Sequence, residues 1–330
     1  MRPFEYSSAA SVDAALDILS QTNNGAIRPL AGGTDLLTLM KADIVTPDQL
    51  VDIKRATGMT DGIAETGDGL RIGALTSLTE LETNPLVRER YPALAEAAAI
   101  AATPQLRNMA TIGGNLLQRP RCWYYRNPLF HCWLKGGDTC HARDGQNRLH
   151  ALFGDSPCVA AHPSDPAIAL LALDASVTVR GASGERQVAL ADFFALPTDD
   201  RRVETTLQPG ELIMDIRLPA TTMRSTYLKA MDRKVWAFAL VSVAAAIQVE
   251  DGKISAACIV LGGVAPIPWR IPAAEQALVG SVPDAATFDR AAEAALTDAQ
   301  PLEHNGYKVP LAQSLIRQAL TALASAANVR

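Results

Sequence analysis

Four of the five cysteines lie close together in the sequence, at Cys122, Cys132, Cys140 and Cys158. Their neighbours are polar, basic or aromatic and follow no helical or strand period, so packing of unlinked thiols in a core explains them poorly. Clustered cysteine thiolates are typical ligands of a zinc ion or of an iron–sulfur cluster. The segment therefore predicts an inorganic site, whereas Cys258 lies apart in an apolar run and is interpreted as a core residue.

The spacing and charge of this segment favour a cluster over zinc without excluding zinc. Structural zinc sites usually take pairs of ligands a few residues apart, and the chain contains no Cys-x-x-Cys pair. Between residues 119 and 150 there are six lysines and arginines against two aspartates, and cations help to hold an anionic, thiolate-ligated cluster. A mixed cysteine and histidine zinc site stays open, because His131, His141, His150 and His162 lie in the same region.

Two glycine turns form the second group of residues that could bind a ligand. The first turn is Gly32-Gly33-Thr34-Asp35, which follows a predicted strand at 26–31 and precedes a predicted helix from 36 to about 40. The second is Thr111-Ile-Gly-Gly-Asn115, in which a hydroxyl residue precedes the two glycines and an amide residue follows them. A turn between a strand and a helix can point backbone N–H groups at an anion, although an ordinary structural turn is an equally good interpretation. Neither turn matches the nicotinamide or the P-loop pattern. Together the two turns could hold the two phosphates of a dinucleotide.

The elements that must position these residues are a mixture of helices and strands. Apolar periodicity and capping residues predict helices at 11–20, from Pro92 to about 103, at 166–173, at 285–297 and at 310–327. Strands are predicted at 70–72, 176–180 and 211–218, and a hairpin at 238–249 and 253–261 around Asp251-Gly252. Residues 119–160 are interpreted as an ordered insertion and residues 219–222 as a linker between two domains.

Length and composition limit the classes of function. A chain of 330 residues with 48% hydrophobic and 20% charged residues predicts about two globular domains. The formal net charge of −5 argues against nucleic acid as a partner. We expect no membrane span, because no apolar run approaches the roughly 20 residues that a span needs, and no secretory signal. The compartment is left open: cytoplasmic, or periplasmic if the chain is exported with a partner that carries a signal.

Three motifs, in order and spacing, resemble the FAD-binding subunit of the molybdenum hydroxylases, the family that includes xanthine dehydrogenase, carbon monoxide dehydrogenase and aldehyde oxidoreductase. They are Pro29–Leu36, the run Gln105–Asn115, and Ser164-Asp165-Pro-Ala-Ile-Ala-Leu-Leu171. The run Gly262–Arg270 is similar to the C-terminal domain of the family. The resemblance covers nearly the whole chain.

The cysteine-rich insertion resembles the one in those members whose flavin subunit holds an extra [4Fe-4S] cluster. These are aldehyde oxidoreductases of the periplasmic type and 4-hydroxybenzoyl-CoA reductase, and Gln118–Arg126 is closer to the former. The resemblance thus implies that Cys122, Cys132, Cys140 and Cys158 are the cluster ligands.

The resemblance also implies the fold and the FAD contacts. We expect an α+β protein with a two-part FAD-binding domain of the vanillyl-alcohol-oxidase type over residues 1–220, including the insertion at 119–160. A C-terminal α+β domain of the CO dehydrogenase flavoprotein type is expected over 221–330. The expected cofactor contacts are Leu30, Ala31, Gly32, Gly33, Thr34, Asp35, Leu36, Ala102, Ala110, Thr111, Gly114, Asn115, Leu117, Asp165, Leu212 and Lys229. For Asp165 and Lys229, a solvated surface charge is the competing interpretation.

The resemblance further implies an electron-transfer role and two partners. A large subunit would hold molybdopterin and oxidise the substrate, an aldehyde in the preferred hypothesis, and a small subunit would hold two [2Fe-2S] centres. Electrons would reach FAD through iron–sulfur centres and leave to an external acceptor. No nucleophile–base pair stands out in the sequence, so no catalytic residue is predicted.

Three alternatives remain. One is the flavin subunit of a complex like 4-hydroxybenzoyl-CoA reductase or xanthine dehydrogenase. Another is a scaffold subunit that is stabilised by a structural zinc ion and transfers no electrons. The third is an FAD oxidase that acts on its own substrate without partner subunits.

Overall fold

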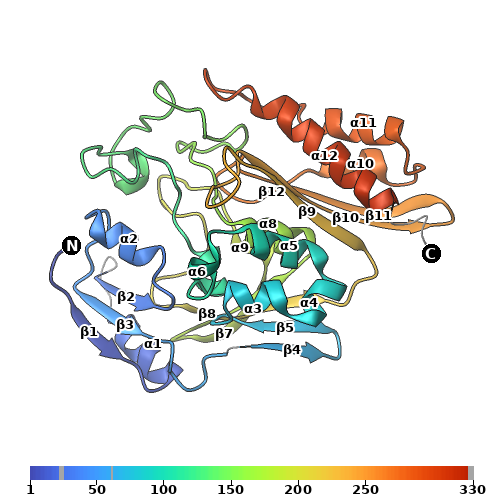
Figure 1. Cartoon of the computed structure of the whole chain (residues 1–330). Helices are drawn as coiled ribbons and strands as arrows, with labels where there is room; N and C mark the ends of the chain where they lie inside the picture. The colour runs from blue at the N-terminus through green and yellow to red at the C-terminus, as the bar shows by residue number, and fades with distance from the viewer. Residues whose placement is uncertain (22–25, 61, 326–330) are drawn as a thin grey trace.

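The computed structural model describes residues 1–21, 26–60 and 62–325. Three sheets with helices between and outside them make up this part of the chain (Figure 1). The first sheet is parallel and has the order β1-β3-β2, formed by Glu5–Ser8, Gln49–Asp52 and Ile27–Leu30. Helix α1, Val12–Ser20, begins at Ser11, whose side chain accepts a hydrogen bond from the N–H of Ala14 at 3.1 Å. Helix α2, Leu36–Lys41, follows the first glycine turn.

The second sheet is antiparallel and has five strands in the order β4-β5-β8-β6-β7. Its strands are Ile63–Thr66, Gly69–Gly73, Leu212–Pro219, Ser176–Gly181 and Gly184–Ala189. The helices that follow β5 are α3 (Leu78–Thr83), α4 (Pro85–Arg90), α5 (Pro92–Ile100), α6 (Pro104–Arg107) and α7 (Ile112–Leu116); α8 (Asp165–Ala172) and α9 (Leu190–Phe193) flank β6 and β7. All residues of α8 are buried, as expected of a helix between two layers.

The third sheet is antiparallel, in the order β12-β11-β10-β9, with strands Trp269–Arg270, Lys253–Gly262, Val241–Glu250 and Arg224–Ala230. Alternate residues of β10 face opposite cores, because side chains alternate along a strand. Ala244 and Ala246 pack toward α5 and α8, whereas Val243 and Ala245 pack toward α10 (Pro272–Leu278), α11 (Ala285–Ala294) and α12 (Lys308–Ser325). Figure 1 shows these last three helices on the outer face of the sheet.

Most of the predicted elements are present, with shifted ends. The helix predicted from Pro92 to about 103 ends at Ile100, because Ala101 is extended and Thr103 caps the next helix. The strand predicted from 238 begins at Val241. The last helix begins at Lys308, and its predicted end at 327 lies outside the described residues. Strands β1, β3, β4, β7, β9 and β12 and the short helices α3, α4, α6, α7, α9 and α10 were not predicted.

The insertion at 119–160 is irregular, as predicted, with one short 3-10 turn at Trp133–Lys135 as its named element. It forms the green loops above the first sheet in Figure 1. Cys258 is buried in the core between the second and third sheets, which confirms its interpretation as a core residue. Among the helices of the described residues, none is long and apolar enough to cross a membrane.

Candidate functional site

The two glycine turns lie against each other, although almost eighty positions separate them in the sequence. A Cβ on Gly32 would lie 1.9 Å from the carbonyl oxygen of Met109, so only glycine allows this approach. Gly33 has a φ of 70°, a backbone conformation that also favours glycine. The strand–turn–helix segment at 27–41 and the segment before α7 therefore meet at their backbones.

The second turn is fixed by hydrogen bonds at its own helix and to the strand beside it. The side chain of Thr111 caps α7 and accepts a hydrogen bond from the N–H of Gly114 at 3.2 Å. The N–H of Gly113 donates to the carbonyl of Ala74 at 2.9 Å. Asn115 accepts a hydrogen bond from the hydroxyl of Ser164, which itself caps α8. These contacts connect the second turn to the helix that begins with Asp165.

Asp165 and Lys229 are buried and pair with each other. Their side chains are 7% and 1% exposed, and Lys229 Nζ lies 2.7 Å from Asp165 Oδ2. The hydroxyl of Tyr227 donates to Asp165 Oδ1 at 2.6 Å. Burial raises the pKa of Asp165 above its usual value, against the opposing effect of Lys229 and Tyr227. The interpretation of these two residues as solvated surface charges is therefore wrong, because they join α8 to the third sheet.

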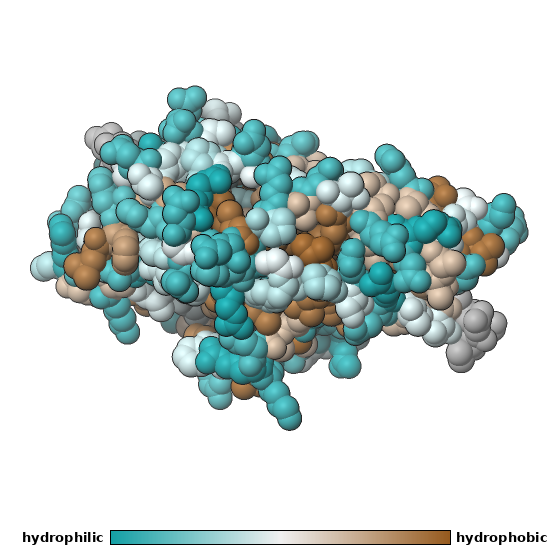
Figure 2. Space-filling model, turned by 90° about the horizontal axis from the view of Figure 1, so that it is seen from above, coloured by the Kyte–Doolittle hydropathy of each residue, from teal (hydrophilic) through white to brown (hydrophobic). Residues whose placement is uncertain are grey.

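A cavity of about 310 Å³ lies between α8, the insertion and the third sheet. Asp165 and His162 line it on one side, Cys122 and His150 on another, and Phe238 on a third. Burial lowers the pKa of His162 to about 3, so this imidazole is neutral at physiological pH. Figure 2, which views the protein from above, shows apolar surface gathered in a hollow near the middle of a largely hydrophilic face. The cavity is of the size and character of a cofactor site.

The four clustered cysteines surround a second cavity, which has a volume of only about 10 Å³. Cys122, Cys132, Cys140 and Cys158 all line it, together with aromatic and apolar side chains such as Trp133. Cys122 also lines the 310 Å³ cavity, so the two cavities share a wall. The four cysteines that the sequence predicts as ligands thus line one cavity. Within the ranges that the structure describes, no group of three or more His, Cys, Asp or Glu side chains is placed to hold a metal ion.

The backbone N–H of Ala160 donates a hydrogen bond to Cys158 Sγ at 3.5 Å. The backbone also acts to lower the pKa of Cys122, at Tyr125 and Tyr124, and the pKa of Cys140, at Val159 and Ala142. Burial raises the pKa of Cys122 to about 11, whereas a hydrogen bond from Cys158 lowers the pKa of Cys140 to about 6. Hydrogen bonds from N–H groups to sulfur are a recurring feature of iron–sulfur sites. The lowered pKa of Cys140 and the N–H donor to Cys158 fit a thiolate-ligated group, whereas burial raises the pKa of Cys122 and the hydrogen bond with Cys140 raises that of Cys158.

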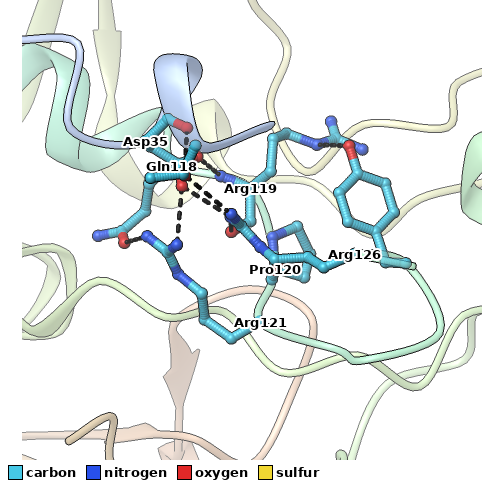
Figure 3. A network of polar contacts seen from close by, with 8 residues as sticks. Asp35, Gln118, Arg119, Pro120, Arg121 and Arg126 are labelled. Carbon is cyan, nitrogen blue, oxygen red and sulfur yellow. Dashed lines mark hydrogen bonds and ion pairs between the residues drawn. The ribbon is translucent and has the colours of Figure 1, made fainter. Parts of the chain in front are cut away.

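The carboxylate of Asp35, at the end of the first glycine turn, binds the first residues of the insertion (Figure 3). Asp35 Oδ1 lies 2.8 Å from Nη1 of Arg121 and 2.7 Å from Nη2 of Arg126. Asp35 Oδ2 accepts the backbone N–H of Arg119 at 2.9 Å. Desolvation lowers the pKa of Arg121 to about 10, against the opposing effect of Asp35. The carboxylate of Asp35, predicted as a cofactor contact, is thus engaged by three residues of the insertion.

The loop between α9 and β8 holds the insertion on a second side. Arg202 donates to the carbonyls of Trp133 and Gly137, both at 2.7 Å, and its guanidinium lies 4.7 Å from the centre of the Trp133 ring. Glu204 pairs with Arg119 at 3.1 Å. Burial raises the pKa of Glu204, while Arg119 opposes this shift.

The end of the chain holds the insertion on a third side. Lys308, at the start of α12, is 0% exposed, and its Nζ donates to the carbonyls of His150 at 2.8 Å and Gly263 at 2.6 Å. Burial lowers its pKa to about 7. Asn305 donates to the carbonyls of His150 and Ala151 at 3.2 and 3.0 Å. The insertion is therefore fixed to both halves of the chain.

The predicted contact residues fall into groups. The turn residues Leu30, Ala31, Gly32, Gly33, Thr34, Asp35, Leu36, Ala110, Thr111, Gly114, Asn115 and Leu117 belong to two turns that adjoin, and Asp165 pairs with Lys229. Ala102 follows α5 with a φ of 50°, a strained value for alanine. Leu212 is buried in the core that α1 forms with the first sheet. Sequence reasoning missed Tyr227, Arg202 and Lys308, for which no motif or spacing gives a signal.

The chain matches two family models. Residues 2–221 match the model described as FAD binding domain in molybdopterin dehydrogenase, and residues 226–323 match the CO dehydrogenase flavoprotein C-terminal domain.

Characterised proteins and solved structures agree with these matches. The FAD-binding subunit PaoB of an aldehyde oxidoreductase from Escherichia coli K12 is 41% identical over 296 residues, which are 88% of this chain and 89% of PaoB. The carbon monoxide dehydrogenase medium chain of Hydrogenophaga pseudoflava is 30% identical over 324 residues, covering 97% and 96% of the two chains. A solved carbon monoxide dehydrogenase from the same organism superimposes with a TM-score of 0.77 at 30% identity, over 98% of each chain.

Replacing Gly32 by alanine should separate the two turns. The new methyl group would overlap the backbone of Met109, which cannot move aside as a flexible side chain could. We expect the purified G32A protein to retain less than half of the wild-type flavin per chain and to unfold at a lower temperature. Gly67→Ala is the matched control, because a Cβ there meets no atom within 4 Å. Equal flavin content in G32A and G67A would contradict the assignment of this contact.

Replacing Asp35 by asparagine should destabilise the insertion. The side chain keeps its shape but loses its charge, which leaves Arg121 and Arg126 without the carboxylate that they share. We expect the free energy of unfolding, measured with urea, to fall by about 2–3 kcal/mol, somewhat below the loss for a fully buried pair. Asp43→Asn, at an exposed pair with the N-terminus, should change it by less than about 1 kcal/mol. Similar losses in both variants would refute the special role of Asp35.

Proposed function

This chain belongs to the family of FAD-binding subunits of the molybdenum hydroxylases, and from that membership we propose that it transfers electrons from iron–sulfur centres through FAD to an external acceptor. The main support for the proposal is that the two cavities share a wall at Cys122. One cavity is lined by four cysteines, and the other, of about 310 Å³, lies beside α8. FAD supplies the chemistry that this role needs, because it accepts electrons one at a time and releases them in pairs.

The two glycine turns are proposed to hold the diphosphate of FAD. Their backbones adjoin at Gly32 and Met109, and each turn lies at the start of a helix whose first backbone N–H groups can bind an anion. Thr34 and Thr111 would add hydroxyl donors. The flavin ring would then lie in the 310 Å³ cavity, which is lined by Asp165, the partner of Lys229, and by apolar side chains such as Phe238.

The second cavity is proposed to hold a [4Fe-4S] cluster on Cys122, Cys132, Cys140 and Cys158. Support comes from the convergence of all four cysteines on one cavity and from the N–H of Ala160, which donates to Cys158 Sγ. The residues around the ligands exclude water and fix their geometry: Trp133 covers the cavity and Arg202 clamps the backbone next to Cys132. Ligand deprotonation would accompany assembly of the cluster.

The partners and the substrate are inferred from relatives. PaoB is named as the FAD-binding subunit of an aldehyde oxidoreductase, and other relatives are medium chains of carbon monoxide and glyceraldehyde dehydrogenases. We therefore propose a large subunit with molybdopterin, where an aldehyde is oxidised, and a small subunit with two [2Fe-2S] centres. The two domains would be residues 1–220 and 221–330. This chain would supply no group to the oxidation of the aldehyde itself.

Metal and sulfide analysis tests the cluster. The purified protein should contain about four irons and four acid-labile sulfides per chain, and Cys132→Ser should lose most of both because a ligand is missing. Cys258→Ala is the matched control, since this cysteine is buried in the core away from the insertion, and it should keep the wild-type content. Zinc without iron or sulfide would instead support a structural scaffold.

Flavin reduction tests the direction of electron flow. In the complex with its partners, an aldehyde added without oxygen should bleach the flavin absorbance near 450 nm, an ordinary property of flavins, whereas the isolated chain should show no bleaching. Chemical reduction with dithionite should bleach both, which controls for a damaged flavin. Bleaching of the isolated chain by the aldehyde alone would mean a self-sufficient oxidase and would overturn the proposal.

A further inference from the structure

Cys122 differs from the other clustered cysteines in its place between the two cavities. Among the described residues it is the one cysteine that lines both of them, and His150 stands beside it on the wall of the larger cavity. The Nε2 atom of His150 lies 3.2 Å from the Sγ atom of Cys122. His150 is 2% exposed, so water does not compete for this contact.

The direction of this hydrogen bond follows from the chemistry of the ligand. A cysteine that binds iron is a thiolate and has no proton to donate. The imidazole must therefore carry its proton on Nε2 and donate it to the sulfur. A donor to a ligand sulfur draws negative charge away from the iron, which stabilises the reduced, more negative state of a cluster.

The position of His150 is fixed from several sides. Its carbonyl accepts hydrogen bonds from Lys308 and Asn305, and its N–H donates to the carbonyl of Asn147 at 2.9 Å. The edge of its ring meets the ring of Trp123, with 5.5 Å between the ring centres. A ring held in this way keeps its donor aimed at one sulfur, which is the property expected of a residue that orients a ligand.

We propose that His150 is a positioning residue that donates a hydrogen bond to the Cys122 ligand and so raises the reduction potential of the cluster at the wall it shares with the flavin. The inference rests on the proposed function and deepens it. Each transfer moves one electron: the iron is oxidised, the flavin accepts the electron, and no bond forms or breaks. Cys122 is then the ligand through which the cluster and the flavin face each other.

Spectroelectrochemical titration of the purified complex tests the proposal with two variants. In His150→Phe the donor is absent, and at the wild-type midpoint the ratio of reduced to oxidised cluster should fall about tenfold, which for one electron is a shift of about −59 mV. In His150→Gln the amide can still donate, and the ratio should stay within about twofold of the wild type. The control His304→Gln changes an exposed histidine and should leave the ratio unchanged.

A measurement on the wild-type complex tests the hydrogen bond even if the His150 variants do not assemble the cluster. In the reduced complex grown with 15N-histidine, electron–nuclear double resonance should detect a nitrogen coupled to the cluster. The coupling should remain in His141→Gln, which replaces a histidine that lines the cysteine cavity. Absence of this coupling, or its loss in His141→Gln, would overturn the proposal.

The possible results distinguish failure of the role of His150 from failure of the proposed electron-transfer function. A fully loaded His150→Phe cluster with an unchanged potential would overturn the role of His150 and leave the electron-transfer function intact. A wild-type complex without iron and sulfide would overturn the proposed cluster, and the role of His150 with it.

Discussion

The insertion that carries four of the cysteines has almost no regular secondary structure, so its conformation depends on polar contacts with the rest of the protein. Asp35 is the centre of these contacts, because it binds two guanidinium groups and a backbone N–H within one short segment. The same residue ends the first glycine turn and precedes α2. One carboxylate thus joins the first glycine turn to the chain that leads into the cysteine-rich insertion.

Two further pairs of opposite charges are largely buried around the site. Asp165 and Lys229 form a pair between α8 and the third sheet, and Glu204 and Arg119 form another beneath the insertion. A buried charge without a partner is costly, so each pair constrains how the layers meet. Lys308 differs, because its Nζ is held by two carbonyl oxygens, and its lowered pKa reflects the desolvation that remains.

Local signals in the sequence predicted local features well. Ser11 predicted the start of α1, and Asp251-Gly252 predicted the turn of the β10–β11 hairpin, because caps and positive-φ turns depend on a few adjacent residues. The edge strand β7 is largely exposed and lacks an apolar alternation, so no pattern indicated it. The approach of Gly32 to Met109 and the reach of Lys308 to His150 join segments far apart in the chain. Such contacts follow from the tertiary fold, which periodicity and spacing do not encode.

The hydrogen bonds that Asn305 and Lys308 donate to the insertion have a consequence for protein engineering. The loop around the cysteines is held by Asn305 and Lys308, more than a hundred and forty positions downstream of the nearest cysteine in that loop. Grafting residues 119–160 alone onto another scaffold would remove the donors that Lys308 and Asn305 supply to the carbonyl of His150. A transplant would need equivalent donors in the recipient, so the cysteine-rich insertion is portable only as a discontinuous set of segments.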